Sequence, residues 1–376
     1  MKKKVLICGG GTGGHLYPAL AIIEHIKDDY PLCRLLFIGT ERGLEREAVS
    51  KFSIDYGTVK SCGLVLKGNV FKKIFNAGKF FYFFVLGFLQ SIKIVLTFKP
   101  DIIIGMGGYI CAPVLSAGIF TGKKIALHEQ NYIPGRLNGL FSKFAKYIFI
   151  SFRDTGRYFK VKKSRVIFTG NPLRKAIRNL KDNKPDFKKW GLEEGRFTIV
   201  AFGGSLGAER INNTVVNLYD YFKNNNKIQI LLICGKRFYD KLMKEKKDKI
   251  SGKDKLILKI FPYIKDIDKI YRITDLMISR AGANTISEII EGNIPSILIP
   301  YPYAVADHQF YNARFLARKK KAVLIRDNDL NEKKIIEIMD LLMKDNGKKY
   351  KEMERRKVKD SGMNSVKIIV SKLMEN

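Results

Sequence analysis

The chain has few of the residues that build disulfide frameworks or transition-metal centres. Its 376 residues include five cysteines and four histidines. The cysteines are scattered, odd in number and never at Cys-x-x-Cys spacing, which is typical of a protein in a reducing compartment. The histidines form no His-x-x-x-His pair. We therefore expect neither a disulfide scaffold nor a dedicated metal site.

Acidic residues are also scarce. The sequence has 36 Asp and Glu compared with 69 Lys and Arg, which gives a formal charge of +33. Part of this excess reflects a general abundance of lysine. The rest would attract a polyanion, either an anionic membrane surface or nucleic acid. The sequence contains no zinc-finger spacing and no RNP-like aromatic motif, so we expect a membrane contribution and no nucleic acid.

A signal peptide is not expected, because only about four apolar residues precede the first glycines. The protein is therefore expected in the cytoplasm. The length and the hydrophobic fraction of 46% fit two soluble domains, each able to bury its own core.

Short, continuously apolar segments alternate with helical patterns, which predicts parallel sheets covered on both faces. Residues 179–185 read as a polar linker between two Rossmann-like halves, and the interface between the halves is the expected ligand cleft. In the first half, strands are expected at 5–8, 35–38, 102–104, 124–127, 147–150 and 166–168, and helices near 16–28, 42–51, 74–97, 111–120 and 135–144. In the second half, strands are expected at 197–202, 229–234, 256–260, 275–278, 296–299 and 322–325. The tail from residue 331 reads as two or three Lys-rich helices.

Three glycine turns follow predicted strands: GGGTGGH at 9–15, GMGGY at 105–109 and GGSLGA at 203–208. Turns after parallel strands lie at the carboxyl edge of the sheet, where ligands bind, and glycine lets the main chain approach a ligand closely. A simple connecting turn is the plain alternative. The first turn also fits the Gly-x-Gly-x-x-Gly spacing of a NAD site, but Glu24 and Glu41 are poor candidates for its acidic residue.

Seven motifs in order resemble the MurG family of glycosyltransferases over residues 4 to 325. Besides the three turns, they are HEQN at 128–131, GNPLR at 170–174, SRAGANTISE at 279–288 and DHQFYNA at 307–313. The resemblance implies an α/β GT-B fold and an inverting transfer of N-acetylglucosamine from UDP-GlcNAc to lipid I, giving lipid II for peptidoglycan. It implies no cofactor, a position on the cytoplasmic face of the inner membrane, and contacts with other cell-wall synthesis proteins. Leu206 departs from the glutamine that many relatives carry.

The resemblance places the acceptor domain at 1–178 and the UDP-GlcNAc domain at 179–354, with a final helix near 355–376 returning to the first domain. Ser205 and Arg174 would hold the diphosphate, since a helix N-terminus and a guanidinium both suit phosphate and make a divalent metal dispensable. Glu288 would bind the ribose, main-chain groups at Ile264 the uracil, and the Gln309 amide the sugar hydroxyls. The segment flanking the sugar is Ala283, Asn284, Thr285, Ile286, Ser287 and Glu288. Tyr301, Pro302 and Tyr303 are expected to be loop packing.

On the acceptor side, His15 is the expected general base, because the pKa of histidine lies closest to neutrality. It could instead bind the donor phosphate or sugar. Glu129 is the second catalytic candidate, and it or His128 could instead brace the wall of the pocket. By resemblance the pocket is completed by Thr12, Gly13, Gly14, Tyr109 and Asn131.

The aromatic run at 80–89 predicts an apolar helix between about 71 and 98. Gln90 and Lys93 interrupt it before the length of about 20 residues that a membrane span requires. We expect one face to pack on the domain and the other to contact anionic lipid, with a fully buried core helix as the alternative. The membrane-facing residues are predicted to be Phe80, Phe81, Phe83 and Phe84 with Lys72, Lys73 and Lys79.

Three other functions stay open at this point. One is another GT-B glycosyltransferase that acts on a lipid. A UDP-GlcNAc 2-epimerase would share the fold and the donor but would not need an exposed aromatic helix. A non-enzymatic basic protein that binds membrane or nucleic acid would have no use for Arg174, Glu288 and Gln309.

Overall fold

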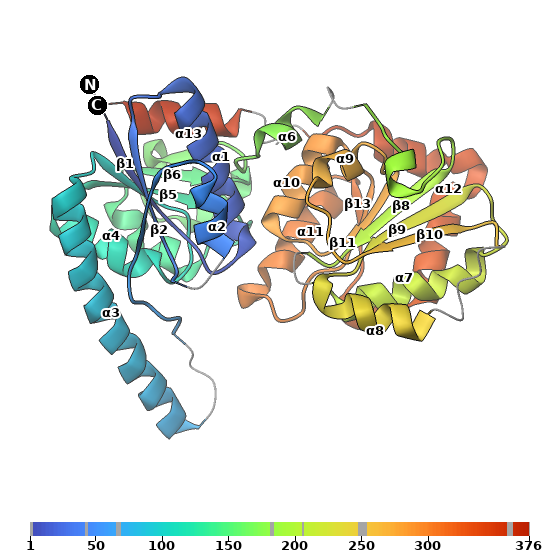
Figure 1. Cartoon of the computed structure of the whole chain (residues 1–376), viewed down its shortest axis with the longest axis horizontal. Helices are drawn as coiled ribbons and strands as arrows, with labels where there is room; N and C mark the ends of the chain where they lie inside the picture. Colours follow the sequence, from blue (N-terminus) through green and yellow to red (C-terminus); the bar gives the residue numbers. More distant parts are fainter. Residues whose placement is uncertain are drawn as a thin grey trace. The chain divides into compact units, whose positions relative to one another are not determined.

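The computed structural model describes residues 3–41, 44–64, 69–180, 184–204, 207–246, 254–358 and 364–375. The chain divides into two compact units, shown in Figure 1. Unit 1 comprises Met1–Lys175 and Gly362–Asn376, and unit 2 comprises Ala176–Ser361. Each unit is built on its own parallel sheet flanked by helices, so the predicted architecture of two Rossmann-like domains is confirmed.

The sheet of unit 1 has the strand order β3-β2-β1-β4-β5-β6-β7, and neighbouring strands pair in parallel. One strand, Asp55–Thr58, was not predicted, because its four residues include a single large apolar side chain. The strands are β1 (Lys4–Cys8), β2 (Arg34–Gly39), β3 (Asp55–Thr58), β4 (Ile102–Gly105), β5 (Lys124–Glu129), β6 (Tyr147–Ile150) and β7 (Val166–Phe168).

The principal helices of unit 1 are α1 (Gly13–Asp29), α2 (Leu44–Ser50), α3 (Val70–Phe98), α4 (Cys111–Phe120), α5 (Arg136–Phe141) and α13 (Ser365–Met374). Successive side chains of β1 enter two different cores, which is why this strand is apolar after Lys4. Val5 and Ile7 pack with α1 and α13 on one face, whereas Leu6 and Cys8 pack with α3, α4 and α5 on the other. The short helix α6 (Lys175–Arg178) stands where unit 1 passes into unit 2.

The C-terminal helix α13 completes unit 1 by covering α1, and the two lie side by side in Figure 1. Its buried residues Val366, Ile369 and Val370 follow the spacing of one helical face. Ser365 fixes the start of the helix by donating from Oγ to the carbonyl of Asn171 at 3.0 Å.

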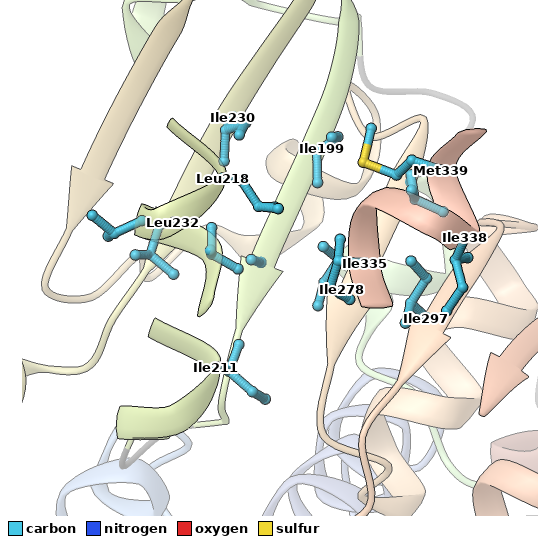
Figure 2. Packing of buried hydrophobic residues seen from close by; sticks show 14 of the residues in the cluster. Ile199, Ile211, Leu218, Ile230, Leu232, Ile278, Ile297, Ile335, Ile338 and Met339 are labelled. Atoms are coloured by element: carbon cyan, nitrogen blue, oxygen red, sulfur yellow. The ribbon is translucent and has the colours of Figure 1, made fainter. Parts of the chain in front are cut away.

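The sheet of unit 2 has the order β10-β9-β8-β11-β12-β13, again with parallel pairs. Its strands are β8 (Phe197–Phe202), β9 (Ile228–Ile233), β10 (Ile257–Phe261), β11 (Leu276–Ser279), β12 (Ser296–Leu298) and β13 (Ala322–Leu324). Its main helices are α7 (Glu209–Phe222), α8 (Lys236–Lys246), α9 (Ile267–Tyr271), α10 (Ala283–Gly292), α11 (His308–Arg318) and α12 (Glu332–Arg355). Figure 2 shows Ile199, Ile278 and Ile297 of the sheet with Ile335 and Ile338 of α12 in one apolar core.

Each sheet has one place where the strand order reverses. This switch point lies between β1 and β4 in unit 1 and between β8 and β11 in unit 2. Loops that leave two such strands run to opposite faces of the sheet and leave a crevice at the carboxyl edge. All three glycine turns follow these strands, so the topology brings the predicted motifs to the two switch points.

Candidate functional site

A buried carboxylate, that of Glu45, binds the glycine turn that follows β1. Gly11 adopts a φ of +84°, which favours glycine, and its N–H donates to Glu45 Oε1 at 2.6 Å. Glu45 is only 3% exposed, and its second oxygen accepts from Thr40 Oγ1 at 3.0 Å. Sequence reasoning missed Glu45, because no motif marks it and it comes from the short helix α2.

His15 is the third residue of α1 and packs against the turn that follows β4. Gly107 and Gly108 have φ values of +102° and +86°. A Cβ atom at Gly107 would lie 2.7 Å from His15 Cε1, so glycine is required for the ring to lie there. The structure therefore brings the two glycine turns of unit 1 together around His15, with Tyr109 against Gly11.

Glu129 ends β5 with its carboxylate surrounded by donors. Oε1 accepts from the N–H of Asn131 at 2.9 Å, and Oε2 accepts from the N–H of Gly135 at 2.9 Å and from Asn138 Nδ2 at 2.7 Å. Burial raises the pKa of Glu129, and these hydrogen bonds oppose the rise. A carboxylate used in this way holds the loop after β5, so the geometry favours the bracing interpretation of Glu129 over the catalytic one.

His128 and Gln130, on either side of Glu129, are also buried. Burial is the main reason that the pKa of His128 falls to about 3, so this imidazole is neutral at physiological pH. Gln130 Nε2 donates to the carbonyl of Met106 at 2.7 Å and joins this loop to the turn after β4. The buried, neutral imidazole of His128 and the main-chain contact of Gln130 are compatible with the alternative that this segment braces the wall of the pocket.

Arg174 belongs to unit 1 and is attached to the helix that carries His15. Its guanidinium carbon lies 5.0 Å from the ring centroid of Tyr17 on α1. The next N–H, of Lys175, donates to Glu24 Oε2 at 2.9 Å, and Lys175 Nζ pairs with Asp28 at 3.2 Å. Arg174 is therefore held along α1, with its guanidinium beside Tyr17 and the next residue bonded to the C-terminal half of the helix.

The structure gives other partners to the acidic residues considered for a NAD site. Glu24 accepts from the main chain of Lys175, and Glu41 pairs with Lys60 at 2.8 Å. Both carboxylates thus have protein partners in place of the ribose of NAD, which argues against the hypothesis of a NAD site.

The switch point of unit 2 begins with the glycine turn after β8. Gly204 and Gly207 have φ values of +92° and +74°, and a Cβ atom at Gly207 would lie 2.1 Å from the carbonyl oxygen of Cys234. Only glycine fits so close to that main chain. Ser205 and Leu206 lie outside the described residues, so the phosphate contact assigned to Ser205 stays a prediction.

Two side chains of α11 fix the turn that leads from β11 into α10. Gln309 Oε1 accepts from the N–H groups of Ala281 and Tyr301, at 3.2 and 3.0 Å. Asn312 Nδ2 donates to the carbonyl of Ala281 at 3.2 Å. The amide oxygen of Gln309 is therefore used by main-chain N–H groups of the protein. The NH₂ group remains as the donor that Gln309 can direct to a ligand, so we now expect the side chain to donate to a sugar hydroxyl rather than both donate and accept.

An ion pair that the sequence did not predict joins the neighbouring loops. Arg280 and Asp327 approach to 2.5 Å, and each side chain is 12% exposed. Arg280 also donates to the carbonyl of Pro300 at 3.1 Å. The loops after β11, β12 and β13 are tied together by these contacts. Among the described residues no cluster of His, Cys, Asp and Glu could hold a metal ion.

The segment predicted to flank the sugar forms the first two turns of α10. Ala283, Ile286 and Ser287 point into the core, whereas Asn284, Thr285 and Glu288 are half-buried. Glu288 Oε2 accepts from the hydroxyl of Tyr271 at 2.6 Å. The Ile264 side chain is buried in the loop after β10, which is compatible with a role for its main chain.

Helix α3 packs on unit 1 only through its C-terminal part. Its buried residues are Gly87, Ser91, Val95 and Phe98, and in Figure 1 its N-terminal part projects away from the unit. By length and composition alone the helix could cross a membrane. Only 17% of its most apolar 18 residues are buried, whereas a core helix would be mostly buried. The buried core helix considered as an alternative is therefore excluded.

The aromatic residues of α3 divide between two faces. Phe80, Phe84 and Phe88 follow one another at 6.2 and 6.3 Å, and Phe88 meets Phe120 of α4 at 5.9 Å. A second, exposed face, here called the exposed stripe, comprises Val70, Phe71, Ile74, Phe75, Phe81, Tyr82, Leu89 and Leu96. Of the predicted membrane residues, Phe81, Lys72, Lys73 and Lys79 are exposed, whereas Phe80, Phe83 and Phe84 are half-buried.

Comparison with known proteins identifies the family. Residues 5–150 match the glycosyltransferase family 28 N-terminal domain, and residues 198–367 match the glycosyltransferase family 28 C-terminal domain. The chain is 40% identical over 341 residues to the UDP-N-acetylglucosamine--N-acetylmuramyl-(pentapeptide) pyrophosphoryl-undecaprenol N-acetylglucosamine transferase of Caldanaerobacter subterraneus subsp. tengcongensis, covering 90% of this chain and 91% of the relative.

Solved structures share the fold at lower identity. MurG of Acinetobacter baumannii superposes with a TM-score of 0.74 at 23% identity, covering 99% of both chains. A UDP-GlcNAc 2-epimerase of Neisseria meningitidis, bound to UDP-GlcNAc, gives a TM-score of 0.65 at 13% identity, covering 99% of this chain and 100% of that one. The fold is therefore common to both enzyme classes, but the domain matches and the 40% identity place this chain among the glycosyltransferases. The chain belongs to glycosyltransferase family 28.

Proposed function

We propose that the enzyme transfers N-acetylglucosamine from UDP-GlcNAc to the MurNAc 4-hydroxyl of undecaprenyl-pyrophosphoryl-MurNAc-pentapeptide (lipid I), forming lipid II. The names of relatives such as the Caldanaerobacter enzyme support these substrates. The structural observation that carries the proposal is the set of side chains and turns found at the two switch points. One holds His15 between two glycine turns, and the other is followed by the helix that carries Glu288 and the loop that Gln309 fixes.

In this proposal the donor nucleotide belongs to unit 2. Main-chain groups at Ile264 read the uracil, and the carboxylate of Glu288 accepts from the ribose hydroxyls. The Gln309 NH₂ group donates to a hydroxyl of the sugar, next to the first turns of α10. The glycine turn at 203–208, including Ser205, and the guanidinium of Arg174 take the diphosphate, for which amides and guanidinium forks are well suited.

We propose the following reaction from the roles assigned to these residues. As the acceptor hydroxyl oxygen attacks the anomeric carbon, His15 accepts the hydroxyl proton, and the bond from that carbon to the diphosphate oxygen breaks on the opposite face. The configuration is therefore inverted, and UDP leaves with the new negative charge. In this proposal Arg174 and the amides of the glycine turn at 203–208 stabilise that charge without a metal ion. Thr12, Gly13, Gly14, Tyr109 and Asn131 surround the acceptor, and Glu129 acts by positioning Asn131.

The test is UDP release from UDP-GlcNAc by the purified protein, with and without a lipid I analogue. We expect release only when the acceptor is present, together with a product that contains the transferred sugar. Conversion of UDP-GlcNAc to UDP-ManNAc without acceptor would overturn the proposal in favour of the epimerase. His15→Ala should lower kcat with little change in donor affinity, and an unchanged kcat would remove His15 as the base.

We also propose that the exposed stripe of α3 binds the anionic surface of the membrane that holds the lipid acceptor. Aromatic and aliphatic side chains of the stripe supply the apolar contact, and Lys72, Lys73 and Lys79 supply charge attraction. In this proposal α3 lies along the interface between membrane and water. Phe71 and Phe75, which are 84% and 72% exposed, replace Phe80 and Phe84 as its main anchors.

The membrane proposal is tested by co-sedimentation with phosphatidylglycerol-containing vesicles. The double variant Phe71→Ser and Phe75→Ser should bind at least about tenfold more weakly, since each buried aromatic contributes on the order of 1–2 kcal/mol. A matched control replaces the exposed Tyr221 and Leu341 of unit 2 by Ser. Equal binding by the two double variants would exclude the stripe as the membrane contact.

A further inference from the structure

Tyr271 has no role in the function proposed so far, yet it makes a short contact with the residue assigned to the ribose. It is the last residue of α9, is 4% exposed, and its hydroxyl lies 2.6 Å from Glu288 Oε2. At this length, a bond from a hydroxyl to a carboxylate is of the strong, charge-assisted kind. The contact therefore fixes the position of one carboxylate oxygen.

A contact of this kind lowers the free-energy cost of using Glu288 to bind a ligand. A glutamate side chain has three rotatable bonds, and fixing them when a ligand binds costs free energy. Glu288 is half-buried on α10, so packing alone restrains it only in part. A bond to a rigid, buried phenol restrains the carboxylate before the ligand arrives, and preorganisation of this kind increases affinity.

The bond to Tyr271 is compatible with ligand binding. A carboxylate offers about four acceptor positions on its two oxygens, so one bond to the phenol leaves acceptor capacity for two adjacent hydroxyls. Tyr271 also joins two parts of the donor site. Its helix α9 follows the loop of Ile264, assigned to the base, whereas Glu288 lies on α10.

We propose that Tyr271 is a positioning residue that holds Glu288 against the two ribose hydroxyls of the nucleotide, and so sets the preference for ribonucleotides over deoxyribonucleotides. This inference rests on the proposed donor site of unit 2. It concerns a residue that acts through Glu288 and touches no reacting atom.

The experiment measures the dissociation constants of UDP and of 2′,3′-dideoxy-UDP, which lacks both ribose hydroxyls, for the wild type and Tyr271→Phe. We expect the substitution to weaken UDP binding about tenfold, the order of one hydrogen bond to a charged group, and to change dideoxy-UDP binding less than twofold. A merely structural role would weaken both nucleotides equally. Equal weakening, or no weakening of UDP, would overturn the proposal.

Tyr219 provides a matched control in the same unit. It is 2% exposed, and its hydroxyl also donates to a carboxylate, that of Asp254, at 2.6 Å. Asp254 precedes β10 and therefore lies at the amino edge of the sheet, away from the switch point. Tyr219→Phe removes the same type of bond and should leave the ratio of the two dissociation constants unchanged.

Glu288→Ala separates failure of this inference from failure of the proposed donor site. If Glu288 binds the ribose, its removal must reduce the preference for UDP over dideoxy-UDP. An unchanged preference in Glu288→Ala would refute the assigned role of Glu288 itself. A reduced preference in Glu288→Ala with a wild-type preference in Tyr271→Phe would refute only the role of Tyr271.

Discussion

The main-chain N–H of Gly11 donates to the Glu45 carboxylate at 2.6 Å, so an internal anion holds the glycine turn of unit 1. A Cβ atom at Gly10 would lie 2.7 Å from the same oxygen, which shows how closely the turn covers Glu45. Because the buried carboxylate also accepts from Thr40, it connects the turns after β1 and β2. The shape of the first glycine turn is thus set by the protein before any substrate binds.

We predict that Glu45→Ala lowers both stability and acceptor use. It removes two hydrogen bonds to a buried carboxylate and leaves the Gly11 N–H without this acceptor, which costs on the order of 2–3 kcal/mol. Loss of the fixed turn should also lower kcat/KM for the acceptor about tenfold while UDP affinity is retained. Denaturant unfolding and steady-state kinetics measure both effects. Glu47→Ala, on the exposed face of the same helix, is the control, and equal behaviour of the two variants would contradict the prediction.

Gly107→Ala should reduce turnover through His15. The new Cβ atom would approach the imidazole to 2.7 Å in a backbone conformation, φ of +102°, that alanine rarely adopts. A displacement of His15 of about 1 Å is enough to lower kcat on the order of a hundredfold. Gly139→Ala, where the space is open, should have wild-type kcat. A wild-type kcat for Gly107→Ala would show that the position of His15 is not critical.

The fold was predictable because periodicity and motif order are properties of the sequence itself. Strands such as β1 and β4 are buried on both faces and therefore appear as continuous apolar runs. Asp55–Thr58 was missed because it lies at the edge of the sheet, beyond β2, and carries little apolar surface. A packed and an exposed face of α3 were predicted, but the aromatic residues on each were not, since both faces are aromatic and only the contact with α4 distinguishes them.

The glycine turns of the site were predictable, because a turn with positive φ such as that at Gly107 needs this residue type; the ligand contact assigned to Glu288 stays a prediction. The site was not predictable where a residue acts through tertiary contact. Glu45 and Tyr271 lie 34 and 17 residues along the chain from the groups they hold, and no motif contains them. Arg280 lies within the motif at 279–288, but its partner Asp327 is 47 residues away. Glu129 illustrates the same limit, since only the donors around its carboxylate show that it braces a loop.

Because Lys321 is buried, we predict that the free energy of unfolding increases at alkaline pH. This side chain is fully buried and donates from Nζ to the carbonyls of Met353 and Glu354, each at 3.0 Å, at the end of α12. Burial lowers the pKa of Lys321 from an ordinary value near 10.5 to about 8. Between these two pH values the unfolded chain binds a proton that the folded protein does not, so the free energy of unfolding should rise with pH.

The increase in the free energy of unfolding is measured relative to the variant Lys321→Met, which keeps much of the side-chain volume but cannot titrate. The difference in free energy of unfolding, wild type minus variant, should be constant below about pH 8. It should then increase by at most about 3 kcal/mol up to pH 10.5. Denaturant unfolding at several pH values gives this difference, and a flat profile would show that Lys321 titrates normally in the folded protein.

Gln309→Glu tests which atom of the amide faces the donor sugar. Oε1 accepts from the N–H groups of Ala281 and Tyr301, and a glutamate oxygen can accept both bonds. The substitution therefore keeps the two loops tied and removes only the NH₂ donor. We expect nearly unchanged stability, about tenfold weaker binding of UDP-GlcNAc and little change for UDP, because only the sugar would lose its hydrogen bond.

The added negative charge must be separated from the lost donor in this experiment. Asn328→Asp introduces the same charge at an exposed position of unit 2 and should bind both nucleotides like the wild type. If Gln309→Glu weakened UDP as much as UDP-GlcNAc, repulsion of the diphosphate would explain the loss. Wild-type affinity for UDP-GlcNAc would instead mean that the NH₂ group makes no contact with the sugar. Only selective weakening of UDP-GlcNAc assigns the donor atom to the sugar, because the uridine diphosphate is common to both ligands.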